Sequence, residues 1–116
     1  MKILINVGEG ICVVRFEGDF LSEVDHETFR EQIRSLAQEG QRHVVIDLEG
    51  VKYINSCGLG SLVCALTTLR RVGGDLRLAN VREHPQKLLE MTQLNRTFEI
   101  YPTLQQALQE FSVQTK

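Results

Sequence analysis

Residues 43–71 read HVVIDLEGVKYINSCGLGSLVCALTTLRR, and this stretch decides the fold. Val44 to Ile46, followed by Leu48, form a short apolar run that is typical of a strand buried on both faces. From Leu59 to Leu69, apolar residues recur at intervals of three and four, which predicts a helix. A buried strand therefore leads through a tight turn into a helix.

The turn between this strand and this helix carries small polar residues. Asn55 or Ser56 is a candidate N-cap, because either side chain can accept a hydrogen bond from an amide of the first helical turn. Arg70 and Arg71 fall in the last turn, where cations suit the helix dipole. The polar loop at the start of this helix is therefore the candidate functional site of the chain.

Towards the N-terminus, the sequence predicts a hairpin and a helix. Lys2 to Val7 and Ile11 to Phe16 are strand-like runs, and the three residues Gly8 to Gly10 between them suit a hairpin connection. Ser22, with Asp25 three residues later, fits the pattern of a helix N-cap. An apolar stripe at helical spacing follows, so this segment is the first predicted helix.

Towards the C-terminus, strands and helices continue to alternate. A strand over residues 76–81 precedes a helix with Pro85 at its first position. A short strand, Phe98 to Tyr101, is followed by a last helix capped by Thr103. The order β-β-α-β-α-β-α-β-α places the chain in the α/β class. We expect one domain, residues 1–116, with a mixed, largely parallel sheet and helices packed on it.

The composition excludes several classes of function. A net charge of −2 gives no general attraction to nucleic acid or to an acidic membrane. No apolar run approaches the roughly 18 residues that a membrane span needs, and the first ten residues lack the features of a signal peptide. Three cysteines without paired spacing indicate reduced thiols and a cytoplasmic protein. No metal-ligand spacing occurs, and we expect neither a cofactor nor enzymatic activity.

The motifs of the chain resemble those of a known family. VVIDLEGVKYINSCGLGSL (44–62), GGDLRLANV (73–81) and LLEMTQLNRTFEIY (88–101) resemble the STAS domain of anti-sigma factor antagonists. The resemblance implies a regulatory protein that binds an anti-sigma factor with a kinase fold and so frees a bacterial sigma factor. In this family the partner kinase phosphorylates a hydroxyl in the loop before the second helix, which ends the binding.

The family motif can be carried over onto the switch loop, which we define as Asn55, Ser56, Cys57, Gly58 and Gly60. The two glycines match the family pattern, and Ser56 matches the first hydroxyl of the motif. Asn55 stands where the family has aspartate, and Cys57 stands where its usual phosphate acceptor lies. Ser56 is therefore the candidate phosphorylation site, and its alternative role is that of a helix cap.

The helix after the switch loop has an unusual predicted outer face. Helical spacing assigns small or weakly polar residues to this face as far as its end: Cys57, Gly60, Ser61, Cys64, Thr67, Thr68 and Arg71. Such a surface suits the docking of another protein, and it would equally suit a homodimer contact. The candidate partner-binding residues are Ser61, Cys64 and Thr68, together with Asp25, which matches a family aspartate near the phosphorylation loop.

Two other interpretations of the sequence remain open. In the first, the protein is a STAS scaffold or subunit of a signalling or lipid-transport complex that is never phosphorylated. In the second, it is a redox sensor or thiol enzyme that uses Cys57, because a helix N-terminus lowers the pKa of a thiol. Both interpretations start from the missing hydroxyl at position 57.

Overall fold

The structure is a computed structural model that describes residues 1–8 and 10–114, with side chains up to Phe111. Its elements are β1 (Lys2–Val7), β2 (Cys12–Glu17), α1 (Glu23–Gln38), β3 (His43–Gly50), α2 (Ser56–Arg71), β4 (Asp75–Ala79), α3 (Glu83–Met91), a 3-10 helix (Leu94–Arg96), β5 (Glu99–Tyr101) and α4 (Leu104–Gln114). The predicted order of strands and helices is confirmed. Glu9, in the predicted hairpin connection, lies outside the described residues.

The strands of the described chain form one five-stranded sheet in the order β1-β2-β3-β4-β5. β1 pairs antiparallel with β2, while β2, β3, β4 and β5 pair in parallel. The expected mixed, largely parallel sheet is therefore confirmed. Parallel neighbours need long crossover connections, which α1 and α2 supply between β2, β3 and β4.

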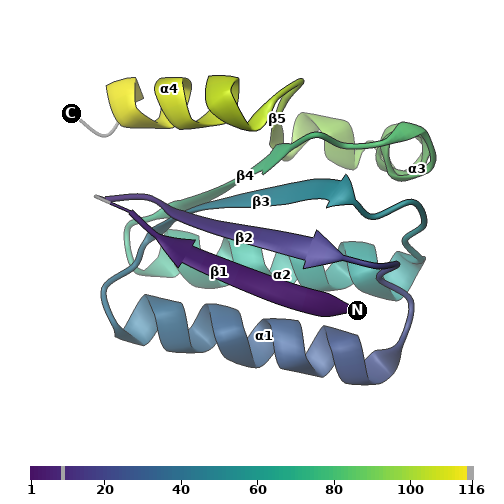
Figure 1. Ribbon diagram of the computed structural model, residues 1–116, viewed down its shortest axis with the longest axis horizontal. Helices are drawn as coiled ribbons and strands as arrows, with labels where there is room; N and C mark the ends of the chain where they lie inside the picture. The colour runs from purple at the N-terminus through teal and green to yellow at the C-terminus, as the bar shows by residue number, and fades with distance from the viewer. Residues whose placement is uncertain (9, 115–116) are drawn as a thin grey trace.

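The helices lie in two layers on either side of the sheet (Figure 1). α1 and α2 run side by side under one face, and α4 lies over the other face above β3, β4 and β5. Because α1 follows β2 and α2 follows β3, both helices begin at the end of the sheet where the C-termini of these two parallel strands lie. The switch loop lies at this edge, close to the start of α1 (Figure 1).

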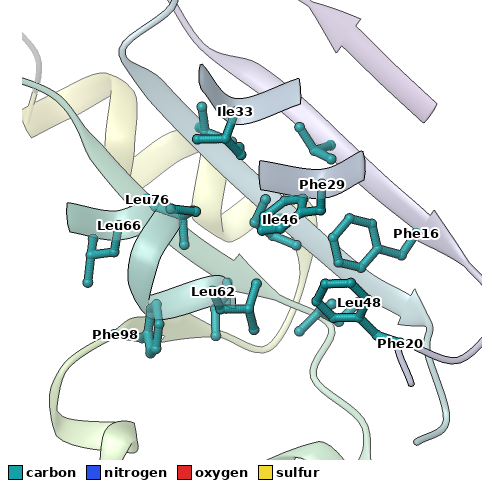
Figure 2. Close-up of a cluster of buried hydrophobic side chains, with 14 of the residues drawn as sticks. Phe16, Phe20, Phe29, Ile33, Ile46, Leu48, Leu62, Leu66, Leu76 and Phe98 are labelled. Carbon is teal, nitrogen blue, oxygen red and sulfur yellow. The ribbon is translucent and has the colours of Figure 1, made fainter. Parts of the chain in front are cut away.

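The main hydrophobic core fills the space between the sheet and the pair α1 and α2 (Figure 2). Three aromatic rings, Phe16, Phe20 and Phe29, pack on one another with centroids 5.0–5.6 Å apart. Cys12 is fully buried in the same core, as expected for a small apolar residue within a strand. The aromatic cluster packs against the N-terminal half of α1 and so supports the candidate site.

One helix, α3, begins at a different residue from the one that the sequence predicts. α3 begins at Glu83, two residues before Pro85, so the prediction of Pro85 at the first helical position was wrong. Proline is tolerated throughout the first turn, because the amides there have no acceptor within the helix. Within the described ranges, no helix is long and apolar enough to cross a membrane.

Candidate functional site

The loops that precede α1 and α2 are held together by hydrogen bonds. The Asp19 carboxylate accepts from the amides of Lys52 and Tyr53, with N–O distances of 3.1 and 3.0 Å. The amide of Phe20 donates to the carbonyl of Tyr53 at 3.1 Å, next to an isolated bridge between Phe20 and Ile54. These contacts join residues more than 30 positions apart and fix the start of α2 relative to α1.

Asn55 is the N-cap of α2, and its amide joins the two loops. Its Oδ1 accepts from the amide of Gly58 at 2.8 Å, and its Nδ2 donates to the carbonyl of Leu21 at 2.9 Å. An ionised aspartate could make only the first bond, since a carboxylate has no donor. The local structure therefore explains an asparagine at this position.

The two glycines of the switch loop have different roles. A Cβ atom added at Gly58 would lie 2.6 Å from Cγ1 of Ile54 and 2.9 Å from the carbonyl oxygen of Phe20. A Cβ atom added at Gly60 would meet no atom within 4 Å. Gly58 thus allows the close approach of α2 to the neighbouring loop, while Gly60 leaves the exposed surface of α2 flat.

A groove of about 600 Å³ lies between the N-terminal halves of α1 and α2. Its lining residues are Leu21, Glu23, His26 and Arg30 from the α1 side, and Asn55, Cys57, Gly60, Ser61 and Cys64 from the α2 side. Cys57 and Cys64 are exposed. Ser56 is also exposed, but it is not among the residues that line this groove. The switch loop therefore presents Cys57 to the groove and Ser56 to the solvent beside it.

The predicted outer face of α2 is exposed at five of its seven positions, and Ser61 and Thr68 are the exceptions. Ser61 is only 3% exposed, so its placement on an open face was wrong. It is buried because α1 packs along this side of α2 and covers more of the helix than an apolar stripe alone would require. Thr68 is half-buried, and its hydroxyl donates to the carbonyl of Cys64 at 2.9 Å within the helix. Cys57, Gly60, Cys64 and Thr67 remain as exposed, uncharged positions.

Asp25 lies in the first turn of α1, outside the groove. Its carboxylate is 3.6 Å from the amino group of Met1, and its backbone amide donates to the hydroxyl of the predicted cap, Ser22, at 3.1 Å. Asp25 does not belong to the residues that line the groove. The structure therefore places the candidate residues Cys57, Gly60 and Cys64 together, and does not bring Asp25 to them.

Sequence reasoning missed His26, which borders the groove while being only 4% exposed. Its ring packs edge-on against Phe20 with a centroid distance of 4.8 Å. A signal was present in the sequence, because His26 lies three and seven residues before Phe29 and Ile33 and so falls on the buried stripe of α1. A titratable residue on such a stripe needs a polar partner or a function.

Comparisons with known proteins agree with this fold. The family model described as STAS domain matches residues 2–107. The chain belongs to the STAS-domain anti-sigma factor antagonist family. A relative from Paenibacillus polymyxa, described as an anti-sigma F factor antagonist, is 30% identical over 117 residues and covers 97% of each chain.

Two solved structures are similar in fold to this STAS domain. An anti-sigma factor antagonist from Mycobacterium paratuberculosis superposes with a TM-score of 0.84 at 25% identity, over 96% of this chain and 93% of the other. The Bacillus cell fate determinant SpoIIAA in its phosphorylated form gives a TM-score of 0.74 at 19% identity, over 94% and 98% of the two chains. The second likeness concerns the fold alone.

Of the three cysteine thiols in this STAS domain, we expect two to be reactive and one to be unreactive in the native protein. Burial, with a smaller effect of Glu39, raises the pKa of the Cys12 thiol, whereas Cys57 and Cys64 are exposed. Since the thiolate is the reactive form, we expect alkylation of the native protein at neutral pH to add two labels, and a third only after denaturation. Mass spectrometry of the labelled protein measures this number. Three labels on the native protein would contradict the buried position of Cys12.

Proposed function

We propose that this protein is a cytoplasmic anti-sigma factor antagonist, which binds an anti-sigma factor with a serine-kinase fold and so releases the sigma factor. The observation that carries this proposal is the match, over nearly the full length of both chains, to the anti-sigma F factor antagonist of P. polymyxa. The exposed residues of α2 suggest the docking surface for this partner.

The docking surface in this proposal is the exposed side of the N-terminal half of α2. Cys57, Gly60 and Cys64 lie one turn apart and carry no charge. The centres of protein interfaces are depleted in charged residues, because each buried charge must be desolvated. Gly60 lets the backbone of a partner approach closely, and Thr68, one turn after Cys64, lies at the border of the surface.

The proposed switch is a phosphate on Ser56. Ser56 is the first residue of α2, and a phosphate there would lie beside amides that have no acceptor within the helix. The fold should therefore tolerate the modification, whereas a docked partner would have to accommodate about −1.5 to −2 added charges. SpoIIAA, a protein of this fold, has been solved in both phosphorylated and unphosphorylated forms, which supports such a switch.

Incubation with the partner kinase and ATP should add one phosphate to the wild-type protein and none to Ser56→Ala. Intact-mass analysis measures the modification. Ser61→Ala is the matched control, because Ser61 is buried and should not be reached by a kinase. It should gain the phosphate as the wild type does. A phosphate retained in Ser56→Ala would assign the switch to another residue.

A second candidate function is that of a constitutive antagonist or scaffold, which binds its partner without being phosphorylated. The observation that favours it is the cysteine at position 57, which lines the groove at the position where the family has its usual phosphate acceptor. Tight binding to the anti-sigma factor without any gain of mass would establish this function in place of the switch. No binding at all would contradict both candidates.

A further inference from the structure

Strand β1 forms an edge of the sheet that is open to further pairing. In the sheet of the described strands, β2 is its neighbour on one side and no strand lies on the other (Figure 1). The edge strand at the opposite end, β5, is only three residues long and is followed by Pro102, and both features protect an edge. β1 has six residues, no proline and no bulge, and its single charged residue, Lys2, is at its first position. The edge of β1 is therefore a surface to which another strand can add.

The free backbone groups of this edge belong to Ile3, Ile5 and Val7. The amide of Gly8 donates to the carbonyl of Ile11 at 2.9 Å, so these two residues form a hydrogen-bonded pair of the β1–β2 ladder. In an antiparallel ladder, such pairs alternate with pairs whose N–H and C=O groups point away from the neighbouring strand. Because the register runs unbroken along β1, its even-numbered residues bond to β2. The three odd-numbered residues, with one N–H and one C=O each, direct six groups outward.

The side chains of β1 make the same edge apolar. Val7 is 52% exposed, Leu4 38% and Ile5 36%, so one short strand carries three of the exposed large hydrophobic residues of the described chain. Ile5 and Val7 lie on the face of the core between the sheet and the pair α1 and α2, since they pair with Val14 and Cys12, which are buried in it. Leu4 lies on the other face, beside an open groove of about 260 Å³ next to α4. Apolar residues that gather in this way, rather than singly, mark a site of protein association.

We propose that β1 pairs antiparallel with β1 of a second copy of this chain, about a two-fold axis at Ile5, so that the two five-stranded sheets become continuous. In this register Ile3 of each copy lies opposite Val7 of the other, and the two Ile5 residues lie opposite each other. All six outward backbone groups of each strand then form hydrogen bonds across the axis. A two-fold pairing of this kind is closed, because it uses the same edge on both copies.

The backbone groups favour this register over its two neighbours. Centring the pair one residue earlier would put Val7 opposite Met1, whose amino group is paired with Asp25 at 3.6 Å. The carbonyl of Val7 would then have no amide as its partner. Centring the pair one residue later would put Ile3 opposite a position beyond Val7, where β1 ends. The register centred on Ile5 therefore pairs every outward group within the two strands.

The side chains of β1 favour a second copy as the occupant of this edge. On the core face, the residues that meet across the axis are apolar on both strands, Ile3 with Val7 and Ile5 with Ile5. Lys2 lies opposite Gly8 of the other copy and opposite Glu17 of its own β2, so no like charges are opposed. The pairing involves no residue of the groove between α1 and α2 or of the switch loop, so it goes beyond the proposed function.

The test is sedimentation equilibrium of the purified full chain, at protein concentrations up to about 1 mM. We expect a reversible equilibrium between monomer and dimer. Ile5→Lys should weaken the dimer by about tenfold or more, because two ammonium groups would meet at the two-fold axis. In the monomer, position 5 is partly exposed at the sheet edge, so the new side chain can keep its charge in solvent.

Met91→Lys is the matched control, because Met91 is 80% exposed at the end of α3 and lies outside β1. This variant adds the same charge and should dimerise as the wild type does, while thermal unfolding verifies that both variants are folded. A protein that stays monomeric at every concentration would overturn the proposal. A dimer that Ile5→Lys leaves unchanged would also overturn it, and would assign the contact to another surface, such as the exposed face of α2.

Hydrogen exchange of the wild-type protein tests the register without any substitution. In the monomer, the amides of Ile3, Ile5 and Val7 face solvent, whereas those of Leu4 and Asn6 are bonded to β2. Raising the protein concentration should therefore slow exchange at the first three amides by about tenfold or more. Unchanged exchange at these amides in the dimer would overturn the proposal. Protection that appears only after purified anti-sigma factor is added would also overturn it, and would assign the edge to a strand of that partner.

Discussion

Gly60→Glu is expected to lower the affinity for the anti-sigma factor by about 100-fold or more, equivalent to about 2.7 kcal/mol. Gly60 is exposed at the middle of the docking surface, and a Cβ atom there meets nothing within 4 Å, so the fold accommodates the new side chain. In the complex, however, the carboxylate would be desolvated without a partner, which costs several kcal/mol. Titration calorimetry with the purified anti-sigma factor measures the effect.

Gly60→Ala and Arg71→Glu are the matched controls for this experiment. The alanine removes the flexibility of a glycine inside a helix and should stabilise the fold by about 1 kcal/mol without adding charge. The second control puts a glutamate on the same helix at its exposed C-terminal end, outside the proposed surface. Affinity unchanged in Gly60→Glu would place the docking site elsewhere on the molecule.

The parts of the site that depend on local spacing could be predicted from the sequence. The caps at Ser22, Asn55 and Thr103 all accept from the amide three residues on, as the positions of polar residues before apolar stripes indicated. The alternation of strands and helices was equally local, since it follows from hydrophobic periods of two and of three to four. These signals were sufficient to place the switch loop at the start of α2.

The parts that depend on which helices touch could not be predicted in this way. Helical spacing assigned Ser61 to the outer face, but α1 covers that side of α2, and the width of a buried stripe depends on the neighbouring helix. The hydrogen bonds of Asp19 to the α2 loop, and of Asn55 to Leu21, join residues 33 and 34 positions apart. No local pattern indicates such pairs, because the packing of α1 against α2 creates them.

The same packing makes Phe20 the side chain through which the core supports the switch loop. Phe20 is fully buried and contacts the rings of Phe16, Phe29 and His26 (Figure 2 shows the three phenylalanines). Phe20→Ala should therefore lower the free energy of unfolding by about 3–5 kcal/mol, out of about 5–15 kcal/mol for a domain of ordinary stability. Urea denaturation measures the loss.

Phe98→Ala is the control that separates a general loss of stability from an effect on the site. Phe98 is buried in the same core, away from Phe20 (Figure 2). We expect a similar loss of global stability in both variants. Only Phe20→Ala should also speed hydrogen exchange at the amides of Gly58 and Leu59, because the backbone of residue 20 contacts the start of α2. Equal exchange in the two variants would mean that α2 keeps its N-terminus in place without the aromatic cluster, and that the hydrogen bonds of Asp19 and Asn55 are sufficient to hold the switch loop.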